Sequence, residues 1–87
     1  MFIILVYDVH QKRVGKVLKI CRKYLHWVQN SVFEGEITRS NFQQLIDELS
    51  EIIDPEYDSI VIYTFRRKAY TDRQTIGREK GGENFFI

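Results

Sequence analysis

The chain has 87 residues, 44% of them hydrophobic, and a net charge of +1, a composition that fits one ordered domain and argues against a second domain or a disordered chain. No segment approaches the ~20 apolar residues of a membrane span, and the single cysteine, Cys21, excludes an internal disulfide. We therefore expect a cytoplasmic protein in a reducing compartment, with no membrane association.

The small net charge hides a strong segregation of charge along the sequence. Residues 1–26 contain six basic residues and a single acid, Asp8, whereas residues 27–58 contain eight acids and one basic residue, Arg39. Residues 59–87 are basic again, with six basic residues against three acids. This layout says more about charged partners than the net charge does.

Residues 2–8 open the chain with an unbroken apolar and aromatic run that ends at Asp8. Such a run, rich in β-branched and aromatic residues, predicts a strand buried on both faces. An acid at the end of a buried strand combines a rigid backbone with an accessible side chain, a position where α/β proteins often place site residues. Asp8 is therefore a candidate site residue, the alternative being that it only solvates the strand end.

A helix is predicted over residues 12–25, because apolar residues recur there at helical spacing. Cys21 falls in the apolar stripe, and we interpret it as a small buried hydrophobic residue. No glutamate occurs between residues 9 and 33, so the opposite face is strongly basic. The apolar face consists of Val14, Val17, Leu18, Cys21, Tyr24 and Leu25, and the basic face of Lys12, Lys16, Lys19 and Lys23.

The next two elements are a strand and a second helix. Residues 27–37 predict a strand in which Gly35 marks a bulge or bend. Ser40 and Gln43 form a capping-box pattern at the start of the helix, and Pro55 ends it. The predicted core face of this helix consists of Phe42, Leu45, Ile46, Leu49, Ile52 and Ile53.

The last third of the chain begins with a second nearly continuous apolar run. Residues 59–65 predict a buried strand, and three basic residues follow it at 66–68. Residues 70–76 suit a further strand. After two glycines, the apolar residues 85–87 predict a tail strand that docks on a sheet edge, either of its own chain or of a partner.

The order β-α-β-β-α-β defines the ferredoxin-like, split βαβ arrangement. Taken directly, the predicted segments give the order β-α-β-α-β-β instead. In that order residues 27–37 are one strand and residues 59–76 form a hairpin. Both predict an α+β fold with a four-stranded antiparallel sheet, two helices on one face, and residues 2–7 and 59–65 as central neighbours. We expect a ferredoxin-like domain over residues 1–80, a tail strand over 81–87, and a homodimer in which a second copy covers the other face of the sheet.

Three segments carry a resemblance to a known family. Residues 4–9 (ILVYDV), 28–35 (VQNSVFEG) and 74–77 (QTIG), together with the apolar C-terminal residues, resemble the small CRISPR-associated endoribonuclease family, the Cas-two family of spacer acquisition. The YDV element is a weak signal by itself. The VQNSVFEG segment at this distance from it, in a chain of this length, is a strong one.

The resemblance implies a ferredoxin-like homodimer that binds nucleic acid and acts as a metal-dependent nuclease on single-stranded RNA or double-stranded DNA. It implies that Asp8 is the catalytic residue and the ligand of Mg²⁺ or Mn²⁺, facing the same residue of the second copy. It also implies that the homodimer bridges subunits of the CRISPR integrase (the Cas-one family) and supports double-stranded DNA in the acquisition complex.

The residues fit this chemistry only in part. One carboxylate is a poor magnesium site, because Mg²⁺ prefers octahedral oxygen ligation and keeps several waters. Two copies of Asp8 across a two-fold axis would improve it, and a metal there could polarise a phosphate. His10 is a candidate proton carrier, the alternative being an ordinary surface histidine.

We expect five basic residues to contact nucleic acid. These are Lys12, Arg13 and Lys16 near the end of the first strand, with Arg66 and Arg67. Such contacts would be sequence-independent and salt-sensitive, because they engage phosphates. The alternative is that the lysines form a solvated helix face.

Three hypotheses on function stay open from the sequence. They are a metal-dependent phosphodiesterase that uses Asp8, a non-catalytic DNA adapter in which Asp8 is structural, and a related RNase toxin.

Overall fold

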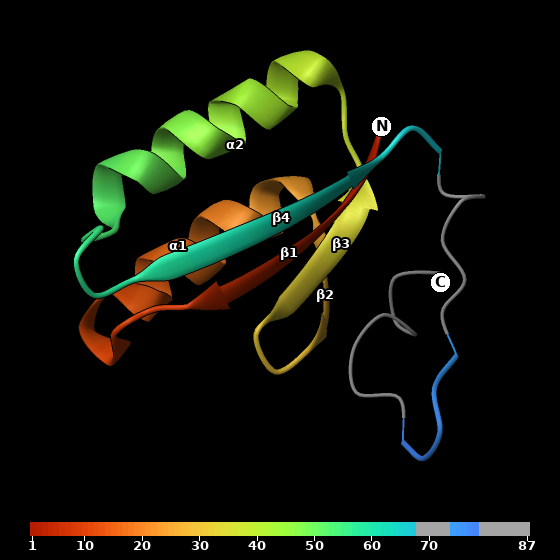
Figure 1. Cartoon of the computed structure of the whole chain (residues 1–87), viewed down its shortest axis with the longest axis horizontal. Helices are drawn as coiled ribbons and strands as arrows, with labels where there is room; N and C mark the ends of the chain where they lie inside the picture. Colours follow the sequence, from red (N-terminus) through yellow and green to blue (C-terminus); the bar gives the residue numbers. More distant parts are fainter. Residues whose placement is uncertain (68–73, 79–87) are drawn as a thin grey trace.

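The computed structural model describes residues 1–67 and 74–78. Residues 2–65 form a four-stranded sheet with both helices on one face (Figure 1). The order along the chain is β1-α1-β2-β3-α2-β4, and the order across the sheet is β2-β3-β1-β4 with every neighbouring pair antiparallel. This confirms the α+β, ferredoxin-like fold. The elements are β1 (Phe2–Asp8), α1 (Gln11–Tyr24), β2 (His26–Gln29), β3 (Val32–Glu36), α2 (Arg39–Ile52) and β4 (Ser59–Phe65).

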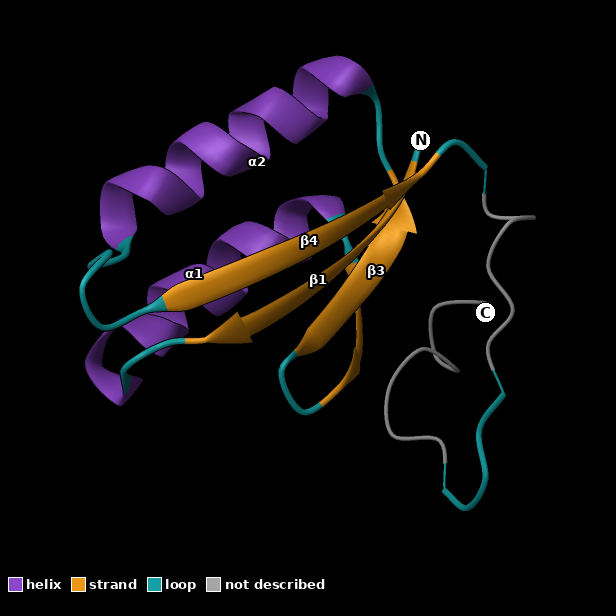
Figure 2. Cartoon of the chain, viewed as in Figure 1, coloured by secondary structure: helices purple, strands orange, loops and turns teal. Residues whose placement is uncertain are grey.

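A hairpin replaces the single strand predicted over residues 27–37. Its turn contains Asn30, which has a positive φ of 44°, a conformation that asparagine tolerates better than most residues. The Asn30 carbonyl accepts hydrogen bonds from Trp27 Nε1 at 3.0 Å and from the Tyr7 hydroxyl at 3.3 Å. Figure 2 shows this turn where β3 begins. The split βαβ order is therefore the correct one of the two that the sequence allowed.

The bulge predicted at Gly35 lies elsewhere. The register shifts between Trp27 and Gln29 of β2, while Gly35 pairs regularly with Ile3 of β1. A Cβ on Gly35 would lie 3.4 Å from Leu25 Cδ2 and 3.6 Å from Leu25 Cα. These are ordinary van der Waals distances, so the packing of the chain after α1 on β3 does not by itself require a glycine at this position.

The prediction that β1 and β4 are neighbours is confirmed, but β4 is not central. It pairs with β1 over its whole length and forms one edge of the sheet within the described residues. The sequence predicted a buried strand because apolar side chains occupy both faces of β4. On the face away from the helices, Val61 is 44% and Tyr63 55% exposed.

The helices begin and end close to the predicted residues, with one difference in capping. The N-cap of α2 is Thr38, whose hydroxyl accepts from the Asn41 N–H at 3.1 Å. The predicted cap, Ser40, lies inside the helix, because the backbone is still extended at Thr38 and becomes helical at Arg39. Leu25 is the C-cap of α1 and Ile53 that of α2, two residues before Pro55.

The core lies between the sheet and the two helices. Its largest fully buried side chains are those of Phe33, Ile3, Leu5, Leu45, Val17 and Cys21. Ile20, which the predicted apolar stripe of α1 omitted, is 8% exposed and belongs to the core cluster. It is covered because α2 packs beside α1.

Two predictions concern the C-terminal part of the chain. The tail strand over residues 81–87 lies outside the described residues. So do residues 70–73 of the predicted strand 70–76, while residues 74–76 are in neither a helix nor a strand. Across the described part of the chain, no helix is long and apolar enough to cross a membrane.

Candidate functional site

Asp8 is the last residue of β1, and its carboxylate is exposed. It pairs in register with Ser59 of β4, whereas the pairing of β1 with β3 ends at Val6. The preceding residue, Tyr7, anchors this strand end: its side chain is 8% exposed and its N–H donates to the Ser31 carbonyl at 3.0 Å. A firmly held backbone therefore presents an accessible acid, as the sequence predicted for this position.

The Asp8 side chain lies on the face of the sheet that the helices leave uncovered. Side chains alternate along a strand, and the core-facing residues of β1 are the odd-numbered ones, Ile3 to Tyr7. The even-numbered residues and Asp8 consequently point to the other face. The apolar residues on that face, by strand alternation and register, are Phe2, Ile4, Val6, Val32, Val61, Tyr63 and Phe65. Of these, Val61 and Tyr63 are exposed, Phe2 is buried, and the other four are half-buried.

The described residues of one chain do not form a complete metal site. Among residues 1–67 and 74–78, no group of three or more histidine, cysteine, aspartate or glutamate side chains could hold an ion. The donor chemistry of Asp8 does suit Mg²⁺ or Mn²⁺, because carboxylate oxygens are the ligands that hard cations prefer. Further ligands would have to come from a second copy, from substrate phosphates or from water.

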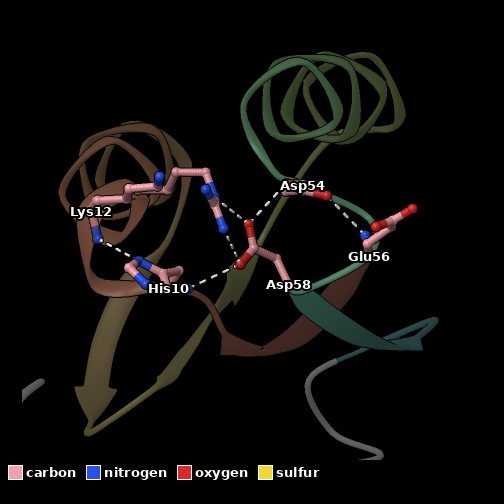
Figure 3. Close-up of polar contacts among 6 residues, drawn as sticks. His10, Lys12, Asp54, Glu56 and Asp58 are labelled. Atoms are coloured by element: carbon pink, nitrogen blue, oxygen red, sulfur yellow. Dashed lines mark hydrogen bonds and ion pairs between the residues drawn. The ribbon is translucent and has the colours of Figure 1, made fainter.

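His10 is exposed and forms the N-cap of α1. Its Nδ1 accepts a hydrogen bond from the Lys12 N–H at 3.1 Å. The backbone N–H of His10 donates to Asp58 Oδ1 at 2.9 Å (Figure 3). The structure thus gives His10 a capping contact, and its predicted role as a proton carrier stays a prediction.

Asp58 immediately precedes β4 and receives four hydrogen bonds. Arg13 donates through Nε to Oδ2 at 2.6 Å and through Nη2 to Oδ1 at 3.1 Å. The remaining two come from the backbone N–H groups of His10, at 2.9 Å, and Asp54, at 2.8 Å, which reach Asp58 from two different segments in Figure 3. The Asp58 side chain is 0% and the Arg13 side chain 18% exposed. This network joins the β1–α1 connection to the α2–β4 connection.

The pKa of Asp58 is held well below its ordinary value of 3.8, mainly by the two hydrogen bonds from Arg13. Burial acts in the opposite direction, and the N–H groups of Asp54 and His10 add to the lowering. The same interaction raises the pKa of Arg13. Asp58 is consequently ionised at any physiological pH, and its charge is matched inside the protein.

Asp58 is the residue at this end of the sheet that the sequence did not reveal. It lies 45 residues from Arg13, and no local pattern links the two positions. The available signal was the Asp54–Pro55 sequence, which is typical of a turn. Asp54 Oδ1 accepts a hydrogen bond from the Glu56 N–H at 3.0 Å, and the Asp54 carbonyl accepts one from the Asp58 N–H at 2.8 Å.

The basic residues predicted to contact nucleic acid fall into two separate groups. Lys12, Arg13 and Lys16 lie on the first half of α1, next to the end of β1 that carries Asp8. Arg66 and Arg67 are exposed and follow Phe65, which pairs with Phe2 at the other end of β1. A strand of this length spans ~20 Å, so one chain does not bring the two groups together.

The lysine face of α1 is mostly open to solvent. Lys12, Lys16, Lys19 and Lys23 are exposed, and Lys23 forms an ion pair with Glu48 of α2. Lys16, Lys19 and Lys23 line an open groove of about 480 Å³ with Ile20 and Ile52. Positive charge therefore extends along α1 from the Asp8 end towards its C-terminus.

The fold and the exposed acid at the end of β1 define a class: a small ferredoxin-like α+β protein with an accessible carboxylate, Asp8, at the end of its first strand, on the sheet face that the helices leave uncovered. Comparison with known proteins gives the family. The family model described as CRISPR associated protein Cas2 matches residues 1–73. The chain therefore belongs to the CRISPR-associated Cas2 family, as its motifs suggested.

Individual relatives agree with this assignment. The chain is 51% identical over 80 residues to the CRISPR-associated endoribonuclease Cas2 of Dictyoglomus turgidum, with 92% of each chain covered. It is 47% identical to the protein of the same name from Thermotoga maritima over all 87 residues, which cover 100% of both chains. A crystal structure of a Cas2 protein superimposes with a TM-score of 0.85 at 44% identity, covering 92% of this chain and 90% of the other.

Proposed function

We propose that this chain acts in CRISPR adaptation as a homodimeric, nucleic-acid-binding endonuclease whose catalytic residue is Asp8. The observation that carries the proposal is the position of Asp8: an exposed carboxylate on a rigid strand end, at the rim of an apolar sheet face that no described helix covers. Its relatives are named endoribonucleases, which supports phosphodiester hydrolysis as the reaction.

The uncovered face supports the homodimer. Val61 and Tyr63 are 44% and 55% exposed there, next to further apolar residues of β1 and β3. An apolar patch of this kind is costly to leave in water, and it is a common mark of a protein interface. A second copy is the proposed cover, since the same patch on both chains is self-complementary about a two-fold axis.

Dimerisation through this face would also complete the reactive site. Each copy contributes Asp8 on the face that meets its partner, so two carboxylates would serve one site. Asp8 from each chain would hold Mg²⁺ or Mn²⁺, which when bound supplies charge neutralisation at a phosphate and a more acidic water. The protein's own part is to fix both carboxylates on stiff strands and to keep them accessible to the phosphodiester backbone.

The basic residues would hold the nucleic acid. We propose that Lys12 and Lys16 contact phosphates near Asp8, and that Arg66 and Arg67 contact them at the other end of the sheet. Because these groups are far apart in one chain, the bound nucleic acid would run along the molecule and meet both copies. The contacts would be sequence-independent, with affinity that falls steeply as salt rises.

An adapter role is the second candidate function. In it the homodimer would bridge subunits of the CRISPR integrase and support double-stranded DNA without cutting it. The observation that favours it is the long basic face of α1, on which Lys12, Lys16 and Lys19 are exposed.

A nuclease assay separates the two functions. Purified protein and its Asp8→Asn variant are incubated with single-stranded RNA or double-stranded DNA, with Mg²⁺ or Mn²⁺ and with a chelator, and nucleic-acid affinity is measured in parallel. The enzyme proposal predicts metal-dependent cleavage by the wild type, none by Asp8→Asn, and unchanged affinity. Cleavage by neither protein, with spacer acquisition intact in the variant, would establish the adapter instead.

A further inference from the structure

The sequence predicts that Arg13 contacts nucleic acid, but in the structure its guanidinium group forms an ion pair within the protein. Two of its nitrogens donate to the Asp58 carboxylate, at 2.6 and 3.1 Å. Only 18% of the Arg13 side chain is exposed, whereas Lys12, one residue earlier, is exposed. A bidentate arginine–carboxylate pair is geometrically specific and is not given up easily to a phosphate.

The pair lies beside the candidate catalytic residue. Asp8 is followed by a two-residue connection, Val9 and His10, before α1 begins at Gln11. Asp58 binds the N–H of His10 at 2.9 Å and the side chain of Arg13 in the first turn of α1. Its own neighbour, Ser59, pairs with Asp8 in the sheet. Asp58 therefore holds the segment that follows Asp8, and it directly precedes the residue that pairs with Asp8 in the sheet.

We propose that Asp58 and Arg13 are positioning residues, which fix the segment after β1 and so set the direction of the Asp8 carboxylate. This inference rests on the proposed function of Asp8. The Asp58 carboxylate is fully used, with two bonds from Arg13 and one each from two backbone N–H groups. With no free hydrogen-bonding capacity for substrate or metal, it acts through the backbone that carries Asp8.

A positioning role has a kinetic signature different from that of a phosphate contact. Loosening the segment after Asp8 should lower kcat by about 10- to 100-fold, as for other residues that orient a reacting group without contacting the substrate. Nucleic-acid affinity should stay within about twofold, because no phosphate contact is lost. A phosphate contact gives the reverse pattern: weaker binding and a salt slope smaller by about one.

The test is a double-mutant cycle with Arg13→Gln, Asp58→Asn and the double variant, and with Lys12→Gln as the matched control for loss of one positive charge. Each protein is assayed below its melting temperature for cleavage, for affinity at several salt concentrations, and by amide NMR. The proposal predicts that Arg13→Gln and Asp58→Asn each lower kcat, that the double variant is no worse than the poorer single one, and that Arg13→Lys restores part of the rate. Lys12→Gln, which removes a proposed phosphate contact, should weaken binding and reduce the salt slope by about one.

The NMR spectra keep this inference separate from the proposed nuclease function. The positioning role is supported if the amide signals of Asp8, Val9 and His10 shift in Arg13→Gln while the Asp8 signal stays unchanged in Lys12→Gln. This support holds even if the wild type cleaves nothing. Unchanged Asp8 and His10 amides in Arg13→Gln would overturn it, whatever the activity. So would additive losses in the cycle, or a salt slope that falls by about one in Arg13→Gln.

Discussion

The two faces of the sheet differ in how their apolar side chains are covered. On one face, Ile3, Leu5 and Phe33 are fully buried beneath the helices. On the other, Val61 and Tyr63 remain largely exposed, although they come from the same set of strands. The difference shows that the covered face gives the single chain its core, and it supports the proposal that a second copy covers the open face. Asp8, the candidate catalytic residue, lies on the open face.

Removal of a large core side chain should have the largest effect on stability. Phe33→Ala should lower the free energy of unfolding by about 3–5 kcal/mol, because Phe33 is 0% exposed and contacts the Tyr7 ring. Urea unfolding at a protein concentration where the chain is monomeric measures this loss. Tyr63→Ala on the open face is the matched control and should change stability by less than about 1 kcal/mol under the same conditions. Equal losses for both variants would contradict the division between the faces.

A charge on the open face should break association while leaving the fold intact. Val61→Glu places a carboxylate in the proposed interface of both copies, so the dissociation constant of the dimer should rise by about 100-fold or more. Sedimentation velocity over a range of concentrations measures it. Asn41→Glu, which adds the same charge at an exposed position of α2, should leave the dimer unchanged. If Val61→Glu sediments with the same mass as the wild type, the interface lies elsewhere.

Acid should weaken the Asp58 network. Because the folded pKa of Asp58 is lowered from 3.8, the unfolded chain takes up a proton at that carboxylate before the folded one does. The stability that Asp58 contributes is therefore complete above about pH 4 to 5 and is lost as the pH falls through the folded pKa. Thermal melts should show a steeper fall of Tm below pH 4 in the wild type than in Asp58→Asn. Parallel curves for the two proteins would mean that other groups dominate the acid response.

Cys21 offers the smallest and most local check on the covered face. Burial raises the pKa of its thiol to about 12, and its side chain is 0% exposed. Since the thiolate is the reactive form, alkylation of the native protein near neutral pH should proceed only as fast as the chain unfolds. The rate in mild urea should then follow the unfolded population. Rapid labelling of the native protein would show that the covered face opens locally.

The sequence predicted those parts of the fold that have a strong local signal. β1 and β4 are continuous apolar runs, and both helices repeat their apolar residues with helical spacing. The sequence predicted a single strand where β2, a turn and β3 occur, because the turn contains Asn30 and no glycine. The edge position of β4 could not be read from the sequence, since its apolar residues on both faces imitate a central strand.

The candidate site was predictable to a similar degree. Asp8 was apparent because a single acid follows a buried run. Lys12 and Arg13 are adjacent and equally basic, yet the structure leaves one exposed and pairs the other with Asp58. That pairing depends on two loops that meet only in the folded chain, so no local pattern could distinguish the two residues.

The central claim is that the open face joins two copies whose Asp8 side chains share one metal ion. A titration with Mn²⁺, followed by calorimetry or by the loss of the free-ion EPR signal, tests this claim without depending on cleavage. We predict one ion bound for every two chains, with binding abolished in Asp8→Asn and strongly weakened in Val61→Glu. Binding of one ion per chain, or undiminished binding by either variant, would contradict the claim.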